Sequence, residues 1–226
     1  YFKDLWPFHN RRPKHHNVTK IEKAAGFICR FVQIDKMIMW FKIVVSCLPA
    51  IIVALPFNDF IEEKFNNYFV VAVMLIVYGV LFILIEDYNK KREPAVNSIA
   101  EISWKMALLI GVFQLLAVIP GTSRSGATII GGILLGASRT VAAEYTFFLA
   151  IPTMFGASLL KLVKFGLHFT GAELMILVVG MVVSFVVSIL AIKFLMGYIK
   201  KHDFKVFGWY RIVLGVIVLL YFTIAG

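Results

Sequence analysis

The sequence predicts an all-α polytopic membrane protein, a helix bundle with a re-entrant broken-helix hairpin. Three observations predict this fold class. The chain is 60% hydrophobic and 16% charged, with a mean hydropathy of +0.86, whereas soluble domains are about 45–50% apolar. Long apolar runs alternate with short charged loops, as in chains that cross a membrane several times. A polar break interrupts the apolar region at Pro120, and this break predicts the hairpin.

A single membrane domain is expected over residues 1–226. Its first part, residues 1–36, is a basic loop in which an amphipathic stretch predicts an interfacial helix. Residues 37–226 hold the membrane spans together with the hairpin, which covers 104–138. Apolar spans are expected over residues 37–56, 68–85, 141–160, 174–195 and 207–225.

The distribution of charge sets the expected orientation. The first 36 residues hold eight Lys/Arg against three Asp/Glu, which is half of the net charge of +10. Basic loops stay in the cytoplasm. The loops expected inside are residues 1–36, 86–105 and 197–206, and the loop expected outside is 57–67. An even number of crossings must then separate Lys105 from Arg139. The apolar run 126–137 is too short to span about 30 Å of hydrocarbon, which favours a hairpin that enters and leaves from one side.

Positive charge alone also suits nucleic acid. The cluster Arg11, Arg12 and Lys14 is short, however, and no nucleic-acid-binding motif accompanies it. Membrane lipids, anionic ones above all, are therefore the expected partners of the basic loops, and nucleic acid is not.

The break at Pro120–Thr128 is the segment that predicts chemistry. Hydrocarbon cannot satisfy irregular backbone, so such a break persists only where protein buries it or water fills a cavity. The break also places the guanidinium of Arg124 at membrane depth, which is costly unless an anion pairs with it. The segment is therefore expected to hold an anionic ligand.

The residue types around Arg124 match that expectation. Gly121 and Gly126 allow unusual backbone angles and close approach of a ligand. Hydroxyl donors are supplied by Ser123, Ser125 and Thr128. A helix that starts near Gly126 directs its N-terminal N–H groups at the loop, and a guanidinium fork suits phosphate. The expected ligand is a phosphate or diphosphate.

Several other readings of this segment are weaker. The pattern G-x-x-x-x-G-A-T resembles a nucleotide P-loop, but Ala127 stands where the lysine should be. Acid phosphatases with a Ser-Arg pattern need a histidine where this chain has Ile129. A rhomboid-type protease needs a histidine on a neighbouring span, and His168 and His202 lie in expected loops. A simple Pro/Gly kink with helix-packing hydroxyls remains the alternative without chemistry.

The motif P-G-x-S-R-S-x-x-T over Pro120–Thr128 resembles the second signature of the undecaprenyl-diphosphate phosphatase (bacitracin-resistance) family. The flanking residues agree with it, among them Gly136-Ala137-Ser138-Arg139 and Ala150-Ile151-Pro152-Thr153. The resemblance implies an inverted-repeat bundle with two re-entrant hairpins, of which this chain holds one half. It also implies an enzyme of the bacterial inner (plasma) membrane. That enzyme removes the terminal phosphate of a C55 polyprenyl diphosphate and so recycles the lipid carrier used in peptidoglycan synthesis.

The resemblance assigns expected roles to the break. By this likeness the catalytic residues are Arg124, Ser123 and Thr128, and the phosphate-binding residues are Gly121, Ser125 and Gly126. Gln114 and Glu144 are accessory candidates. Gln114 could equally make a helix–helix hydrogen bond, and Glu144 could form an ion pair with Arg139 or Arg124.

The family's first signature, a Glu-rich motif with a serine and a histidine, is not present in this sequence. The expectation is therefore a chain truncated before its first hairpin and inactive alone, although its parent would be active. A divalent metal, Mg²⁺ or Ca²⁺, is implied by the resemblance only, because the chain shows no cluster of carboxylate ligands for it. The oligomeric state is open, with a homodimer as one option.

A transporter or flippase for a phosphorylated polyprenyl lipid is the rival function. Broken helices at the midplane are also how transporters bind substrates, but a transporter leaves the phosphate bond intact. A structural membrane protein without a ligand is disfavoured by the buried Arg124.

Overall fold

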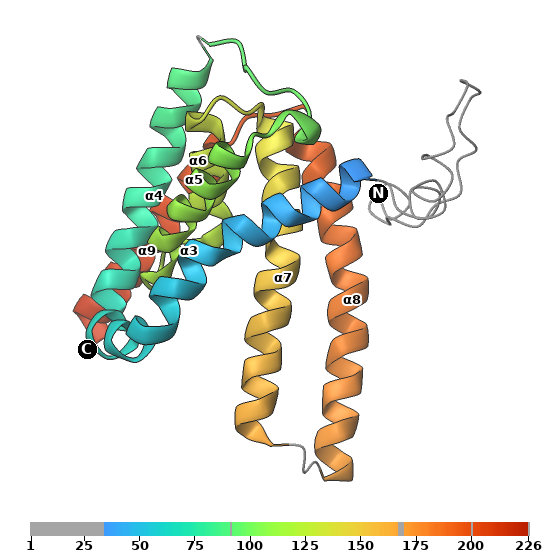
Figure 1. The fold of residues 1–226 in the computed structure, drawn as a ribbon. Coiled ribbons are helices and arrows are strands. Elements are labelled where there is room, and N and C mark those ends of the chain that lie inside the picture. The colour runs from blue at the N-terminus through green and yellow to red at the C-terminus, as the bar shows by residue number, and fades with distance from the viewer. Residues whose placement is uncertain (1–33, 91, 167–169, 200, 226) are drawn as a thin grey trace, which may run out of the picture.

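The computed structural model describes residues 34–90, 92–166, 170–199 and 201–225, all as helices and connecting loops (Figure 1). In chain order the elements are α3 (Ile34–Phe65), α4 (Tyr68–Asn89), η1 (Ile99–Glu101), α5 (Trp104–Leu115), η2 (Leu116–Val118), α6 (Arg124–Leu134), α7 (Arg139–Phe165), α8 (Gly171–Ile199) and α9 (Lys205–Ala225). The described part has no strand, so the predicted all-α class is confirmed.

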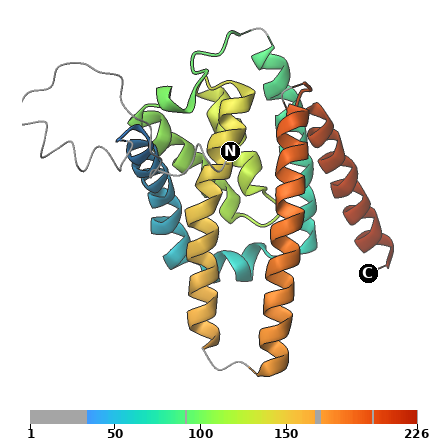
Figure 2. The same ribbon diagram turned by 90° about the vertical axis from the view of Figure 1, so that its right-hand side faces the viewer.

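Five of these helices are long and apolar enough to cross a membrane, namely α3, α4, α7, α8 and α9. Their outer faces carry large apolar side chains, such as Phe185, which is 64% exposed, and faces of this kind suit contact with lipid. The helices α7 and α8 reach beyond the rest of the bundle in both views (Figures 1 and 2). The protein is therefore a multi-pass membrane protein.

The pair α5 and α6 forms the predicted break between two short helices. With 12 and 11 residues, each is less than about 20 Å long, too short for a hydrocarbon core of about 30 Å. The loop before α5 and the loop after α6 are joined by two backbone hydrogen bonds. The Val96 N–H donates to the Gly136 carbonyl at 3.0 Å, and the Ser138 N–H donates to the Val96 carbonyl at 2.9 Å. The hairpin thus begins and ends at the same end of the bundle.

Close backbone contact fixes α4 against α9. A Cβ atom added at Gly79 would lie 2.7 Å from the Gly208 carbonyl oxygen, and one added at Gly208 would lie 2.7 Å from the Gly79 oxygen. Small residues at helix crossings are the usual way for membrane helices to approach closely. The two helices run side by side (Figure 1).

Ion pairs connect the loops at the end where α5 begins. Glu86 on α4 pairs with Arg139 at the start of α7, and Lys90 lies 3.2 Å from Asp203. Lys205 lies 2.5 Å from Asp87. The predicted basic loops 86–105 and 197–206 therefore lie at one end, as the charge pattern requires of loops on the same membrane side. The assignment of that end to the cytoplasmic side stays a prediction.

Helix α3 differs from its predicted extent. It begins at Ile34, and it continues to Phe65 through Pro49 and Pro56 instead of giving way to a loop after residue 56. Hydropathy marks where a chain leaves the hydrocarbon, and polar helix formers such as glutamate can continue a helix beyond that point. The interfacial helix predicted from Lys20 falls almost entirely outside the described residues.

Candidate functional site

A tight turn at Pro120 and Gly121 reverses the chain between η2 and α6. The Thr122 N–H donates to the Ile119 carbonyl at 3.1 Å, and Gly121 has a φ of +87°, as expected for the third residue of a type II turn with proline before it. A Cβ atom on Gly121 would lie 2.5 Å from the Val71 carbonyl oxygen on α4. Both conformation and space therefore require glycine here.

Ser123 caps the N-terminus of α6. Its hydroxyl accepts a hydrogen bond from the Gly126 N–H at 3.1 Å and lies 3.0 Å from the Ser125 hydroxyl. The first N–H groups of α6 consequently point at the break, where their partial positive charge favours an anion. Ser125 is exposed and Ser123 is half-buried, so a ligand can approach both side chains from outside the protein.

Arg124 opens α6 and reaches toward α7. Its Nη1 donates to the Thr153 hydroxyl at 2.9 Å, and that hydroxyl donates to the Leu149 carbonyl at 2.8 Å. In the described part of the chain no carboxylate forms an ion pair with Arg124. An arginine at membrane depth costs about 2.5–3.5 kcal/mol on insertion scales, and one neutral hydroxyl does not offset that. The local charge calls for an anionic ligand.

Thr128 lies on the inner side of α6. It is 1% exposed; its hydroxyl lies within hydrogen-bonding distance of two backbone carbonyls, that of Arg124 at 3.0 Å and that of Ser125 at 3.2 Å. It accepts a hydrogen bond from the Thr146 hydroxyl at 3.0 Å. The structure therefore brings Ser123, Arg124 and Ser125 together at the start of α6, where they are exposed or half-buried, and buries Thr128 one turn later.

The two accessory candidates lie on α5 and α7. Gln114, on the last turn of α5, is 3% exposed, and its side-chain oxygen has no hydrogen-bond partner among the described residues. Glu144 is half-buried on α7. Arg139 forms its ion pair with Glu86. This residue was expected in a loop, but it lies on α4 because the helix continues past its apolar run.

A second arginine, not predicted from the sequence, lies next to the break. Arg211, on α9, lies over the ring of Phe82 on α4, with its guanidinium carbon 5.7 Å from the ring centroid. Phe82 in turn lies against the start of α6, where a Cβ on Gly126 would be 3.2 Å from the ring. Arg211 stood in the sequence as a lone cation within an apolar run, and that was the only available signal.

Comparison with known proteins now decides the family. Residues 1–217 match the family model of the bacitracin resistance protein BacA. The chain belongs to the BacA family. It is 65% identical over 193 residues to an undecaprenyl-diphosphatase of Desulfitobacterium hafniense, covering 85% of this chain and 69% of that protein. It is 57% identical over 225 residues to one of Lachnoclostridium phytofermentans, covering 100% and 76%. It is 60% identical over 189 residues to one of Enterococcus faecalis, covering 84% and 68%.

The described residues of this BacA-family chain do not fit a divalent metal. They contain no group of three or more His, Cys, Asp or Glu side chains that could hold one. The break offers hydroxyls, backbone N–H groups and a guanidinium, whereas Mg²⁺ and Ca²⁺ take carboxylate and carbonyl oxygens. No step of the reaction can be routed through a metal held by these residues.

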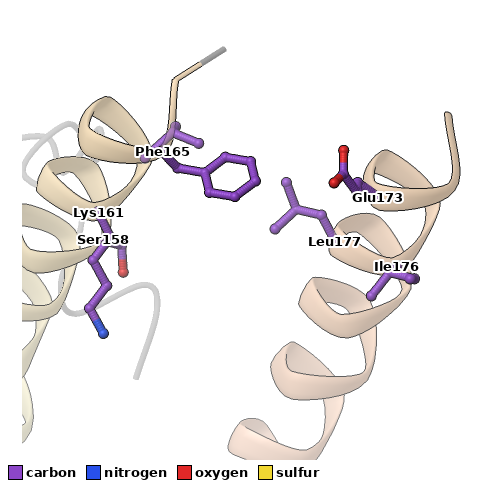
Figure 3. A pocket seen from close by; sticks show the side chains of 7 residues that line it. Ser158, Lys161, Phe165, Glu173, Ile176 and Leu177 are labelled. Atoms are coloured by element: carbon purple, nitrogen blue, oxygen red, sulfur yellow. The ribbon is translucent and has the colours of Figure 1, made fainter. Parts of the chain in front are cut away.

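An open hollow of about 520 Å³ lies between the far ends of α7 and α8 (Figure 3). Lys161 and Phe165 line it from α7, and Glu173 and Leu177 line it from α8. None of the predicted site residues of the BacA-family chain lies there. The wall is mostly apolar, and the chemistry predicted from the motif belongs to the break instead.

Proposed function

We infer that this chain is a polyprenyl-diphosphate phosphatase that hydrolyses undecaprenyl diphosphate to undecaprenyl phosphate and inorganic phosphate. Membership of the BacA family and the undecaprenyl-diphosphatase names of its relatives support this assignment. The single structural observation that carries it is Arg124, a guanidinium at the N-terminus of α6 that has no carboxylate partner among the described residues. The hydrolysis breaks the bond between the bridging oxygen and the terminal phosphorus, and water supplies the new oxygen on the released phosphate.

The residues of the break would act by positioning and charge neutralisation, which supply most of the catalysis in phosphoryl transfer. In this proposal Arg124 binds a phosphate group through its planar fork. The hydroxyls of Ser123 and Ser125 donate hydrogen bonds from the same side, together with the N–H groups at the start of α6. Thr128 holds the carbonyl of Arg124 from behind, and so acts on the site through the backbone.

We further propose a requirement for a divalent cation, Mg²⁺ or Ca²⁺, which rests on the family resemblance. Its ligands would have to be residues other than those described around the break. Chelation of the purified protein with EDTA should abolish phosphate release, and added Mg²⁺ or Ca²⁺ should restore it. Full activity in the presence of EDTA would refute the requirement.

The remaining proposals concern the surroundings of the enzyme. Its place is the bacterial plasma membrane, where its product would re-enter cell-wall synthesis. The basic loops would contact anionic lipid headgroups. A homodimer is a further proposal, to be tested by measuring the mass of the protein in native nanodiscs.

The function is tested by phosphate release from undecaprenyl diphosphate in detergent. Arg124→Ala should lower kcat/KM by about a hundredfold or more, because it removes a charge-assisted fork. Arg124→Lys should retain part of the activity, since it keeps the charge but loses the fork. Lys161→Ala, which removes an exposed cation at the distant hollow, is the matched control and should leave the rate unchanged.

The rival function, lipid transport, predicts a different result. A transporter would bind undecaprenyl diphosphate through Arg124 and release no phosphate under any metal condition. That outcome would refute the phosphatase assignment.

A further inference from the structure

Arg211 is a half-buried cation that the packing of the described residues does not explain. It is the seventh residue of α9, and its Nη1 atom is buried with no hydrogen-bond partner among the described residues. Among the described residues no carboxylate forms an ion pair with it. Its neighbours are aromatic, namely the ring of Phe82 and the side chain of Tyr78, both on α4.

These aromatic neighbours do not account for an arginine at this position. A cation–π contact offsets only part of the cost of removing a guanidinium from water. The Nη1 atom of Arg211 lies inside the protein, away from solvent. If the position served packing alone, an apolar side chain would be more stable there. An unpaired cation within a span is instead typical of a residue that binds an anionic substrate.

Two contacts place Arg211 beside the break. Its stacking partner Phe82 lies against the first turn of α6 at Gly126. Its other neighbour, Tyr78, lies beside Thr122, whose hydroxyl is buried without a well-formed hydrogen bond. Tyr78 thus lies between Arg211 and the turn, and Phe82 lies between Arg211 and the N-terminus of α6. Arg124 approaches the same N-terminus from the α7 side, where it contacts Thr153.

A diphosphate presents two anionic phosphate groups, and one guanidinium fork matches one of them. We propose that Arg211 is a second diphosphate-binding residue, which binds one phosphate group while Arg124 binds the other. The Thr122 hydroxyl, which lies beside Tyr78, donates to the phosphate on the Arg211 side. This inference rests on the proposed phosphatase function, and it adds that the site distinguishes a diphosphate from a monophosphate by using two cations from helices far apart in the sequence.

The experiment compares Arg211→Gln and Arg211→Lys in the whole protein. Arg211→Gln should raise KM for undecaprenyl diphosphate, and the inhibition constant of inorganic diphosphate, by about tenfold or more, since hydrogen bonds to a charged group are lost. The inhibition constant of inorganic phosphate should change much less, because one phosphate group can still bind at Arg124. Arg211→Lys should lie between the Gln variant and the wild type.

Arg92→Gln is the matched control. Arg92 also lies over an aromatic ring of α4, 4.4 Å from the centroid of Tyr88, but it is exposed in a loop at the charged end. Its replacement should leave KM and both inhibition constants unchanged. Equal effects of Arg92→Gln and Arg211→Gln would overturn the proposal, because they would reflect overall charge.

Other outcomes also decide the question. Unchanged constants in Arg211→Gln would refute the binding role, and unfolding of both Arg211 variants would show a structural role instead. Binding of inorganic diphosphate is followed separately by its protection against thermal unfolding. If the wild type is protected but releases no phosphate, the phosphatase function fails while the Arg211 comparison still tests the proposal.

Discussion

Arg124 is held by one hydroxyl, and this contact determines where its guanidinium lies. Thr153 places its Oγ1 2.9 Å from Nη1 and is itself anchored to the backbone of α7 at Leu149. In the sequence Thr153 stands out only as part of the family likeness, because a threonine in an apolar helix ordinarily bonds to the backbone one turn before it. Its role depends on a helix-to-helix contact that spacing does not reveal.

Thr153→Val tests this positioning role. The change removes the hydroxyl but keeps the shape of the side chain, so Arg124 should lose its orientation and kcat/KM should fall by about three- to tenfold. Thr223→Val is the control, because Thr223 makes the same backbone contact on α9, to Leu219 at 2.8 Å, but is exposed. Phosphate-release kinetics that are equal in the two variants would contradict the positioning role.

At the scale of the element, the break could be predicted from sequence, whereas its second cation could not. Pro120 and Gly121 cannot continue a helix, and the polar residues after them cannot face hydrocarbon, so the hairpin followed from local chemistry. Arg211 gave only the signal of a charge in an apolar run. Its place beside the break depends on how α9 packs on α4, which no local pattern encodes.

Gly121→Ala tests the turn itself. A Cβ atom would contact the Val71 carbonyl, and the positive φ would be strained, so the midpoint of thermal unfolding should fall, by an amount equivalent to about 1–3 kcal/mol. Gly156→Ala is the control, since Gly156 lies within α7 with nothing within 4 Å of an added Cβ. That change should be neutral or slightly stabilising. Similar unfolding midpoints for both variants would show that the turn tolerates a side chain.

The ion pairs at the charged end should differ in their contribution. Glu86 is 1% exposed and pairs with Arg139, so Glu86→Gln should destabilise the protein by about 2 kcal/mol or more by leaving the arginine without its partner. Asp87 is 54% exposed in its pair with Lys205, and Asp87→Asn should cost less than about 1 kcal/mol. Denaturant unfolding measures both changes. A larger effect of Asp87→Asn would contradict this ranking.

At the scale of the whole molecule, the polytopic class followed from composition, and the grouping of the loops followed from charge. The loops at residues 92–103 and 201–204 lie at one end, and the turn between α3 and α4 lies away from them (Figure 1). Sequence could also give the order of the spans. It could not give the extent of α3 or α4, because a helix does not end where the hydrocarbon ends.

Cysteine labelling tests the orientation. In a version without its native cysteines, Asn97→Cys should be protected from a membrane-impermeant maleimide added to intact cells, because the positive loops stay inside. Asn66→Cys, in the turn after α3, should be labelled. Both positions are exposed at the protein surface. Labelling of position 97 from outside would reverse the predicted orientation.

The contact between Gly79 and Gly208 has a consequence for motion. Because the two backbones meet without intervening side chains, α4 and α9 cannot slide past one another without a clash, and they should move as one rigid body. Phe82 and Arg211 travel with that body, whereas Arg124 belongs to α6 and contacts α7. A change in the angle between the α4–α9 pair and α7 would therefore lengthen or shorten the distance between the guanidinium groups of Arg124 and Arg211.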